Sequence, residues 1–189
     1  MKNNRVIFLH GASSSGKTAI AKKLQEKLDA PYLHIGIDKI IGLMPKKLND
    51  WDGKIVEQGF SWEVSHDASG KQLAQLKVGT FAHKISDLFK KIVLVALEND
   101  HHVIIDEVCV ISGSFEEWKR LLLQYKTLYV GLKIDLDILD QRERARGDRM
   151  IGSARFQAMI IHQNKEYDLE INTGTTDVET SAALIINKL

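Results

Sequence analysis

Short apolar runs alternate with amphipathic stretches along most of this chain. The runs that read as strands cover residues 6–9, 32–37, 103–108, 128–134 and 169–171. The stretches between them follow a helical period: residues 17–28, for example, place apolar or small side chains at Ile20, Ala21, Leu24 and Leu28. Strands that alternate with helices need crossover connections, so the pattern predicts an α/β fold with a parallel sheet and helices on both faces.

Three further helices are predicted later in the chain. Residues 75–98 continue the helical period without a break. Ser114 with Glu117, and Thr176 with Glu179, each match a capping box in front of apolar positions. We therefore expect Ser114 and Thr176 to be the N-cap residues that open two helices.

The stretch from about residue 42 to residue 75 does not follow this alternation. Residues 60–64 alternate between apolar and polar side chains as a strand does, and residues 66–70 resemble a turn. We interpret the stretch as an inserted hairpin near the functional site. Trp51 and Trp62 form either a substrate wall or a small core there, whereas Trp118 is expected in the main core.

Composition narrows the class of protein. With 189 residues, 44% of them hydrophobic and 27% charged, residues 1–189 fit a single domain. The net charge is +1, from 26 basic and 25 acidic residues, so no nucleic-acid partner is expected. Cys109 is the only cysteine, and no apolar run is long enough to cross a membrane or form a signal-peptide core. We expect a cytoplasmic protein without a membrane partner, and the sequence leaves open whether it forms a homo-oligomer.

A phosphate-binding loop follows the first predicted strand. The segment Gly11-Ala12-Ser13-Ser14-Ser15-Gly16-Lys17-Thr18 matches the pattern G-x-x-x-x-G-K-[ST] and precedes a predicted helix. Its glycines let successive N–H groups converge on phosphate oxygens, and the helix N-terminus adds positive potential. Lys17 is expected to reach the β- and γ-phosphates of ATP, and Thr18 to offer its hydroxyl to Mg²⁺.

Two acidic residues end the third predicted strand. Asp106 and Glu107 lie at the sheet edge where parallel sheets bind ligands, so Asp106 is predicted to hold Mg²⁺ through water. Helix capping is the alternative for this pair. An Asp-Glu pair also suits ATPases, in which the glutamate orients a water molecule, so hydrolysis stays open as a rival function.

Asp38 follows the second predicted strand at the same edge of the sheet. It is the candidate catalytic base, because orienting the acceptor hydroxyl matters more in phosphoryl transfer than early deprotonation. The alternative is that Asp38 only caps the helix that continues through Ile40 and Ile41.

Arginines gather in residues 137–153. On a helix, Arg142, Arg146 and Arg149 fall on one face, and Gly147 would end or hinge that helix. Such a face suits a lid over the transferring phosphate. The alternative is a solvated face paired with Asp140, Glu143 and Asp148.

Taken together, these residues resemble the chloramphenicol phosphotransferase family of P-loop kinases, whose relatives include zeta-toxin-type sugar-nucleotide kinases. The similarity runs nearly end to end. It is carried by residues 11–18, 36–38, 44–45, 104–108 and 142–149, and later by His162 and residues 167–173.

The resemblance implies a P-loop kinase sandwich of three layers with a five-stranded parallel sheet. It also implies an ATP-dependent O-phosphotransferase in which Asp38 serves the primary hydroxyl of the acceptor, the arginines form a lid, and residues 172–174 border the adenine. Glu107 and Arg144 depart from the family pattern. The predicted function is phosphorylation of a small-molecule alcohol, with an antibiotic and an endogenous alcohol both open as acceptor; a nucleotide-binding ATPase switch and a sugar-nucleotide kinase are the alternatives.

Overall fold

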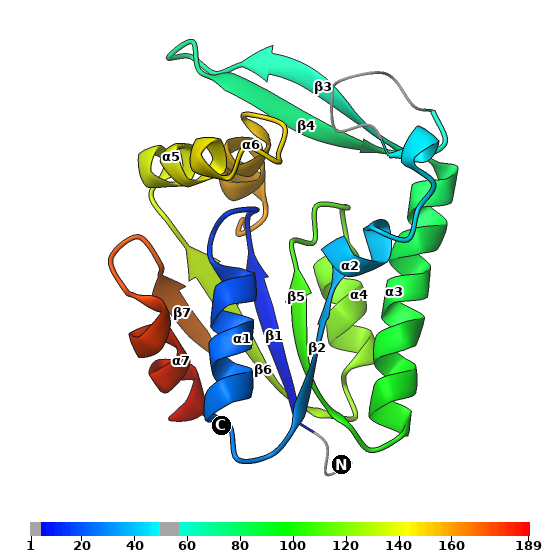
Figure 1. Cartoon of the computed structure of the whole chain (residues 1–189), viewed down its shortest axis with the longest axis vertical. Coiled ribbons are helices and arrows are strands. Elements are labelled where there is room, and N and C mark those ends of the chain that lie inside the picture. Colours follow the sequence, from blue (N-terminus) through cyan, green and yellow to red (C-terminus); the bar gives the residue numbers. More distant parts are fainter. Residues whose placement is uncertain (1–4, 50–56) are drawn as a thin grey trace.

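The computed structural model describes residues 5–49 and 57–189 (Figure 1). Its centre is a five-stranded parallel sheet in the order β2-β5-β1-β6-β7. The strands are β1 (Arg5–Gly11), β2 (Tyr32–Gly36), β5 (His102–Glu107), β6 (Lys126–Lys133) and β7 (Leu169–Asn172). The helices are α1 (Lys17–Lys27), α2 (Ile37–Ile41), α3 (Thr80–Glu98), α4 (Ser114–Leu121), α5 (Leu136–Arg146), α6 (Ser153–Ile160) and α7 (Val178–Ile186), with a 3-10 turn at Lys46–Leu48. The predicted α/β fold with five parallel strands is confirmed.

Alternate residues of β1 supply the two cores that make the fold three-layered. Val6 and Phe8 pack with α3 and α4 on one face of the sheet, whereas Ile7 and Leu9 pack with α1 and α7 on the other. Both faces of the central strand are buried, which explains why it reads as a continuous apolar run. Because all five strands are parallel, the loops that follow them gather at one edge of the sheet.

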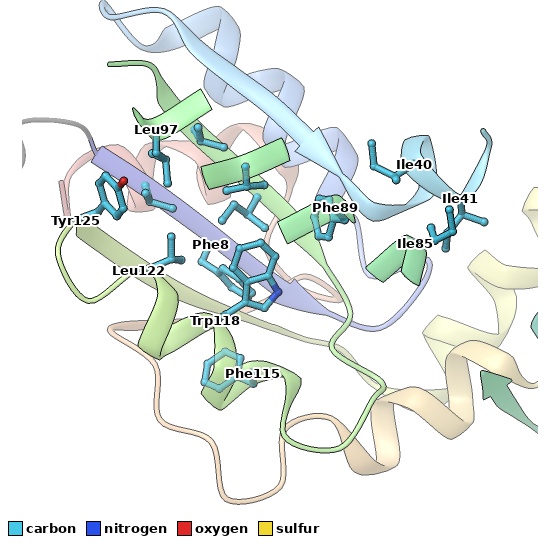
Figure 2. Packing of buried hydrophobic residues seen from close by; sticks show 14 of the residues in the cluster. Phe8, Ile40, Ile41, Ile85, Phe89, Leu97, Phe115, Trp118, Leu122 and Tyr125 are labelled. Carbon is cyan, nitrogen blue, oxygen red and sulfur yellow. The ribbon is translucent and has the colours of Figure 1, made fainter. Parts of the chain in front are cut away.

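Trp118 lies in the core between α4 and the sheet, as expected (Figure 2). Its ring meets those of Phe8 and Phe89 edge-on, at centroid distances of 5.6 and 5.4 Å. Edge-to-face contacts of this kind favour one packing arrangement of the rings. The sheet face covered by α3 and α4 is thus closely packed with aromatic rings.

The inserted hairpin is formed by β3 (Phe60–His66) and β4 (Gln72–Val78), which pair antiparallel. The prediction that a helix begins at residue 75 is wrong: residues 75–78 belong to β4, and α3 begins at Thr80. Leu76 and Val78 alternate with exposed Gln75 and Lys77, a strand pattern too short to stand out beside the long helical stretch that follows. Trp62 lies on β3, while Trp51 is outside the described residues.

Three predicted element boundaries shift by about one residue. Gly113, not Ser114, occupies the N-cap of α4, and Asp177, not Thr176, caps α7 by accepting a hydrogen bond from the backbone N–H of Thr180. Strand β2 ends at Gly36, so α2 already includes Ile37. The helices exist as predicted, but neighbouring residues with capping ability compete for the cap position.

The arginine segment, residues 137–153, is not one helix. Helix α5 ends at Arg146, with Gly147 in the left-handed conformation (φ 69°), and α6 begins at Ser153. The prediction that Gly147 ends the helix is confirmed, but the placement of Arg149 on that same helix is wrong. Within residues 5–49 and 57–189, no helix has both the length and the apolar character needed to cross a bilayer.

Candidate active site

The phosphate-binding loop connects the C-terminal end of β1 to the first turn of α1. Gly16 caps α1 with φ 96°, a backbone conformation that residues other than glycine rarely adopt. The carbonyl of Ala12 accepts hydrogen bonds from the N–H of Ser15 (3.2 Å) and from Nζ of Lys17 (2.9 Å). The loop is therefore tightly curled around residues 12–16, as the sequence pattern predicts.

Thr18 and Asp106 lie together at the start of α1. The hydroxyl of Thr18 donates to Oδ2 of Asp106 at 2.6 Å, and Nζ of Lys17 lies 3.9 Å from Oδ1. Nε2 of His34 lies 3.4 Å from Oδ2. Burial alone would raise the pKa of Asp106, but hydrogen bonds from His34 and Thr18 and the charge of Lys17 hold this pKa below its usual value. Asp106 is therefore an anion at neutral pH.

A hydroxyl and a carboxylate in contact are hard oxygen ligands of the kind that Mg²⁺ prefers. Within the described part of the chain, no group of three or more His, Cys, Asp or Glu side chains could hold a metal ion. Mg²⁺ keeps several water molecules and binds phosphate oxygens, so it needs only one or two ligands from the protein. The pair Thr18 and Asp106 thus passes the chemical test for this ion.

Glu107 is buried at the end of β5. Its Oε1 accepts hydrogen bonds from the N–H groups of Val108 (2.9 Å) and Cys109 (3.1 Å). Burial raises its pKa, against these two hydrogen bonds and the charge of Lys17. One oxygen of Glu107 is thus occupied by the loop that follows it.

Asp38 lies in the first turn of α2, and its side chain is exposed. Its Oδ2 forms an ion pair with the guanidinium of Arg149, which comes from the turn after α5. No side chain caps α2, whose N-cap is Gly36, so the capping alternative for Asp38 does not hold. Residues 111 positions apart in the sequence therefore meet at the sheet edge.

The other two arginines have different partners. Arg142 donates to the backbone carbonyl of Thr173 at 2.8 Å, and Arg146 pairs with Asp148 at 3.1 Å. The solvated-face alternative describes Arg146 correctly. It is wrong for Glu143, which is buried and accepts hydrogen bonds from the first residues of α6.

Several site residues were not predicted from the sequence. The most direct is Gln157 of α6, whose Oε1 accepts a hydrogen bond from the N–H of Ser13 in the phosphate-binding loop at 2.8 Å. Arg155, on the same helix, pairs with Asp67 of the hairpin (2.9 Å) and Asp140 of α5 (3.0 Å). Neither has a local sequence signal, because their partners are distant in the chain.

A second unpredicted feature is a chain of hydrogen bonds below the phosphate-binding loop. Nε2 of His10 must donate to the carbonyl of Val108 (2.8 Å), so Nδ1 accepts from the hydroxyl of Tyr167 (2.6 Å). The same oxygen then accepts from Nδ1 of His162 at 2.8 Å. Burial, with the charge of His162 next, lowers the pKa of His10 to about 3, so His10 is neutral at pH 7.

One cavity of about 920 Å³ joins these groups. It extends from the phosphate-binding loop past Asp38 and the arginines to the hairpin and the gap between α3 and α4. Its lining includes Ser13, Ser14, Ser15, Gly16, Lys17, Thr18, Asp38, Phe60, Trp62, Leu76, Val78, Asp106, Arg142, Arg146, Arg149, Gln157 and Thr173. Gly11 and Ala12 complete the loop, with Ala12 buried beneath it.

Comparison with known proteins gives one family. The family model described as chloramphenicol phosphotransferase-like protein matches residues 4–189. A Mycobacterium tuberculosis protein provisionally named an O-phosphotransferase is 27% identical over 182 residues, which make up 96% of this chain and 80% of that protein.

Solved structures give the fold. A crystal structure of a provisionally assigned kinase from Chloroflexus aurantiacus aligns over 100% of both chains with a TM-score of 0.64 at 12% identity. The APS kinase of Mycobacterium tuberculosis, in complex with AMPPNP and APS, aligns over 98% of this chain and 96% of that chain with a TM-score of 0.65 at 12% identity. At these identities the likeness establishes the P-loop kinase fold.

Proposed function

This chain belongs to the chloramphenicol phosphotransferase-like family, and on that premise we propose that it transfers the γ-phosphoryl group of ATP, with Mg²⁺, to a hydroxyl of a small molecule. The observation that carries the proposal is one cavity lined both by the phosphate-binding loop and by Asp38, whose carboxylate forms an ion pair with Arg149. A phosphate-binding loop alone supports nucleotide binding, whereas a carboxylate at the same cavity supplies the group that an acceptor needs.

The nucleotide side of the mechanism uses residues 11–18. Backbone N–H groups of the loop and the N-terminus of α1 bind the phosphates, and Lys17 moves from the carbonyl of Ala12 to the β- and γ-phosphates. Thr18 and Asp106 would hold Mg²⁺, which would supply positive charge to neutralise the phosphate oxygens. Because Oε1 of Gln157 accepts a hydrogen bond from the N–H of Ser13, helix α6 helps to keep the loop in this shape.

The acceptor side uses Asp38. Its carboxylate accepts a hydrogen bond from the acceptor hydroxyl and orients the oxygen towards the γ-phosphorus. As the new P–O bond forms, the bond between the γ-phosphorus and the β–γ bridging oxygen breaks, ADP leaves, and Asp38 takes up the proton of the hydroxyl. Arg149 forms an ion pair with this carboxylate and is one of three arginines in the cavity that can stabilise charge on the transferring group. A cytoplasmic location, where ATP is abundant, is part of the same proposal.

The test is Asp38→Asn, assayed with labelled ATP and a panel of alcohols that includes chloramphenicol, sugar nucleotides and amino alcohols, with products identified by mass spectrometry. We expect nucleotide binding to be retained and acceptor phosphorylation to fall by about 100-fold or more, because the amide can no longer accept the proton. Asp29→Asn, at an exposed position away from the cavity, is the matched control. Undiminished product from the Asp38 variant would remove Asp38 from the mechanism.

The same assay separates the rival functions. Phosphate release that no alcohol diverts into a phosphorylated product would favour an ATPase switch. A sugar nucleotide as the only phosphorylated compound would favour a zeta-toxin-like acceptor range. Parallel reactions with GTP test whether ATP is the preferred donor.

A further inference from the structure

The floor of the cavity, between α3 and α4, carries three buried hydrogen-bond donors that the proposed mechanism does not use. They are Lys90 on α3 and Ser114 and Trp118 on α4, and all three line the cavity. Ser114 and Trp118 are four residues apart, so they lie on the same side of α4. Each of the three residues is at most 8% exposed.

Two of these donors lack a strong partner. Nε1 of Trp118 has no hydrogen-bond partner among the described residues. The hydroxyl of Ser114 has none there other than the weakly interacting thiol of Cys109 beside it. A buried polar group left in this state costs about 1–3 kcal/mol, so such groups call for an explanation. A ligand that enters the cavity and accepts both hydrogen bonds would provide one.

Lys90 adds a positive charge at the same floor. Its ammonium lies 2.6 Å from Oε2 of Glu117 and 3.4 Å from Oδ1 of Asp87. Both acidic partners are more exposed than Lys90, and neither lines the cavity. Because an ammonium has three N–H donors, one remains for a group inside the cavity.

The N-terminus of α4 contributes further positive potential at this point. Gly113 caps the helix in the left-handed conformation (φ 78°) and has no side chain that could accept a hydrogen bond from the first turn. Ser114 is the first residue of this helix and lines the cavity. A helix N-terminus favours negative charge, and here it lies beside the two donors that lack strong partners.

An apolar passage connects this floor with Asp38. Ile37 and Ile41 flank Asp38 on α2, and the hairpin contributes Phe60, Trp62, Leu76 and Val78, all of which line the cavity. Ser86, one helical turn before Lys90, lies along the same face of α3. A molecule that reaches from Asp38 to Lys90 therefore passes an apolar wall before it meets the donors.

We propose that Lys90, Ser114 and Trp118 form an oxyanion site that binds a carboxylate at the far end of the acceptor. The substrate class is thus a hydroxy acid with an apolar or aromatic body, and its hydroxyl faces Asp38 while its carboxylate faces the α3–α4 floor. This inference rests on the proposed function for the phosphoryl transfer, but the binding site itself does not depend on catalysis.

The acidic side chains near this site have partners of their own. Glu107 lines the cavity, and one of its oxygens accepts hydrogen bonds from the N–H groups of Val108 and Cys109. Asp106 also lines the cavity and contacts Thr18 and Lys17, and Glu116, in the first turn of α4, pairs with Lys165. Glu117 balances part of the charge of Lys90, so its removal should strengthen the site. Replacing Lys90 and replacing Glu117 are therefore expected to change the affinity for a carboxylate in opposite directions.

The experiment compares two matched probes by isothermal titration calorimetry on the full chain. One is para-(hydroxymethyl)benzoate, with its longer homologue para-(hydroxymethyl)phenylpropanoate, and the other is para-methylbenzyl alcohol, which lacks the carboxylate. We expect at least one carboxylate to bind about tenfold more tightly than the neutral alcohol, the order of one hydrogen bond to a charged group.

Variants connect this preference with the named residues. Lys90→Met is expected to abolish the preference, and Trp118→Phe, which keeps an aromatic ring but removes the N–H, to reduce it about threefold or more. Lys91→Met is the matched control, because it removes the same charge from an exposed position on the same helix. Glu117→Gln is expected to increase the affinity for the carboxylate, a result that loss of folding cannot produce.

Three results would overturn the proposal: equal binding of charged and neutral probes, no binding of either, or a preference that survives Lys90→Met. Transfer of phosphate from ATP to the same probes is measured separately. A carboxylate that binds with the expected preference but is never phosphorylated contradicts the proposed function and leaves the oxyanion site standing. If the probes are phosphorylated but the carboxylates bind no more tightly than the neutral alcohol, the oxyanion site is contradicted and the proposed function stands.

Discussion

Glu143 is the residue whose replacement tests the architecture around the site most directly. It comes from α5 and is 1% exposed. Its Oε2 accepts a hydrogen bond from the N–H of Gly152, and its Oε1 accepts from the N–H of Ala154 and the hydroxyl of Ser153, all at 2.7 Å. A charged side chain thus caps α6 from another helix.

The change Glu143→Gln keeps the size of the side chain but alters this cap. The amide has one acceptor oxygen, which can keep the two hydrogen bonds at the Oε1 position, while its NH₂ group faces the N–H of Gly152. A hydrogen bond to a charged group contributes about 1.5–3 kcal/mol, and a buried donor left without a partner adds a penalty of similar size. We expect the free energy of unfolding to fall by about 3 kcal/mol, which for a chain of this length lowers Tm by roughly 6–12 °C.

Thermal denaturation followed by circular dichroism measures this shift, with Glu98→Gln at the exposed end of α3 as the matched control. Nucleotide affinity is measured on the same samples, and we expect it to fall because Gln157 of α6 holds Ser13. A Tm within about 2 °C of the parent would refute the reasoning, since a buried acceptor of three hydrogen bonds cannot be that easily replaced.

Three further predictions follow from the contacts around the loop. Gln157→Leu should weaken ATP binding about tenfold without a comparable loss of stability, measured by calorimetry; unchanged affinity would show that the loop holds its shape alone. Lys17→Ala should weaken binding of ATP more than that of adenosine, and equal losses would place the ammonium away from the phosphates. His10 has a pKa of about 3 in the folded state and near 6.5 in the unfolded state. Between these pH values the unfolded state binds more protons. The contribution of neutral His10 to the free energy of unfolding is therefore complete above pH 6.5 and is lost as the pH falls towards 3. Urea unfolding should show a loss of about 2 kcal/mol from pH 7 to pH 5 in the parent and less in His10→Gln; equal slopes would contradict a neutral, buried His10.

The parts of the site that the sequence predicts are those that depend on local pattern. Residues 11–18 need only a strand before them, a helix after them and glycines at fixed positions, so the loop is visible in eight residues. Asp38 and Asp106 directly follow or end apolar strands, and a parallel sheet brings such residues to one edge without further information. The elements β1, β2 and β5 then determine their relative positions.

What the sequence does not predict depends on contacts between distant segments. Gln157 is an ordinary polar residue on a helix until α6 folds against the loop 144 positions earlier. Arg149 continues the spacing of Arg142 and Arg146 in the sequence. Because the helix ends at Gly147, however, Arg149 lies outside it and its guanidinium pairs with Asp38. The apolar pattern likewise places the ring of Trp118 in the core, but it does not predict that the indole N–H lacks a hydrogen-bond partner among the described residues.

The start of α6 joins parts of the site that the sequence separates. Gly152 adopts φ 86°, and its carbonyl accepts a hydrogen bond from the N–H of Ala74 on β4, so the hairpin is attached here. A Cβ on Gly152 would lie 2.4 Å from the carbonyl oxygen of Gln72, which means that only glycine permits this approach. Glu143 connects the same point to α5, and Gln157 connects the helix to the phosphate-binding loop. The hairpin and the phosphate-binding loop both line the cavity, so α6 holds two walls of the same cavity in place through these contacts.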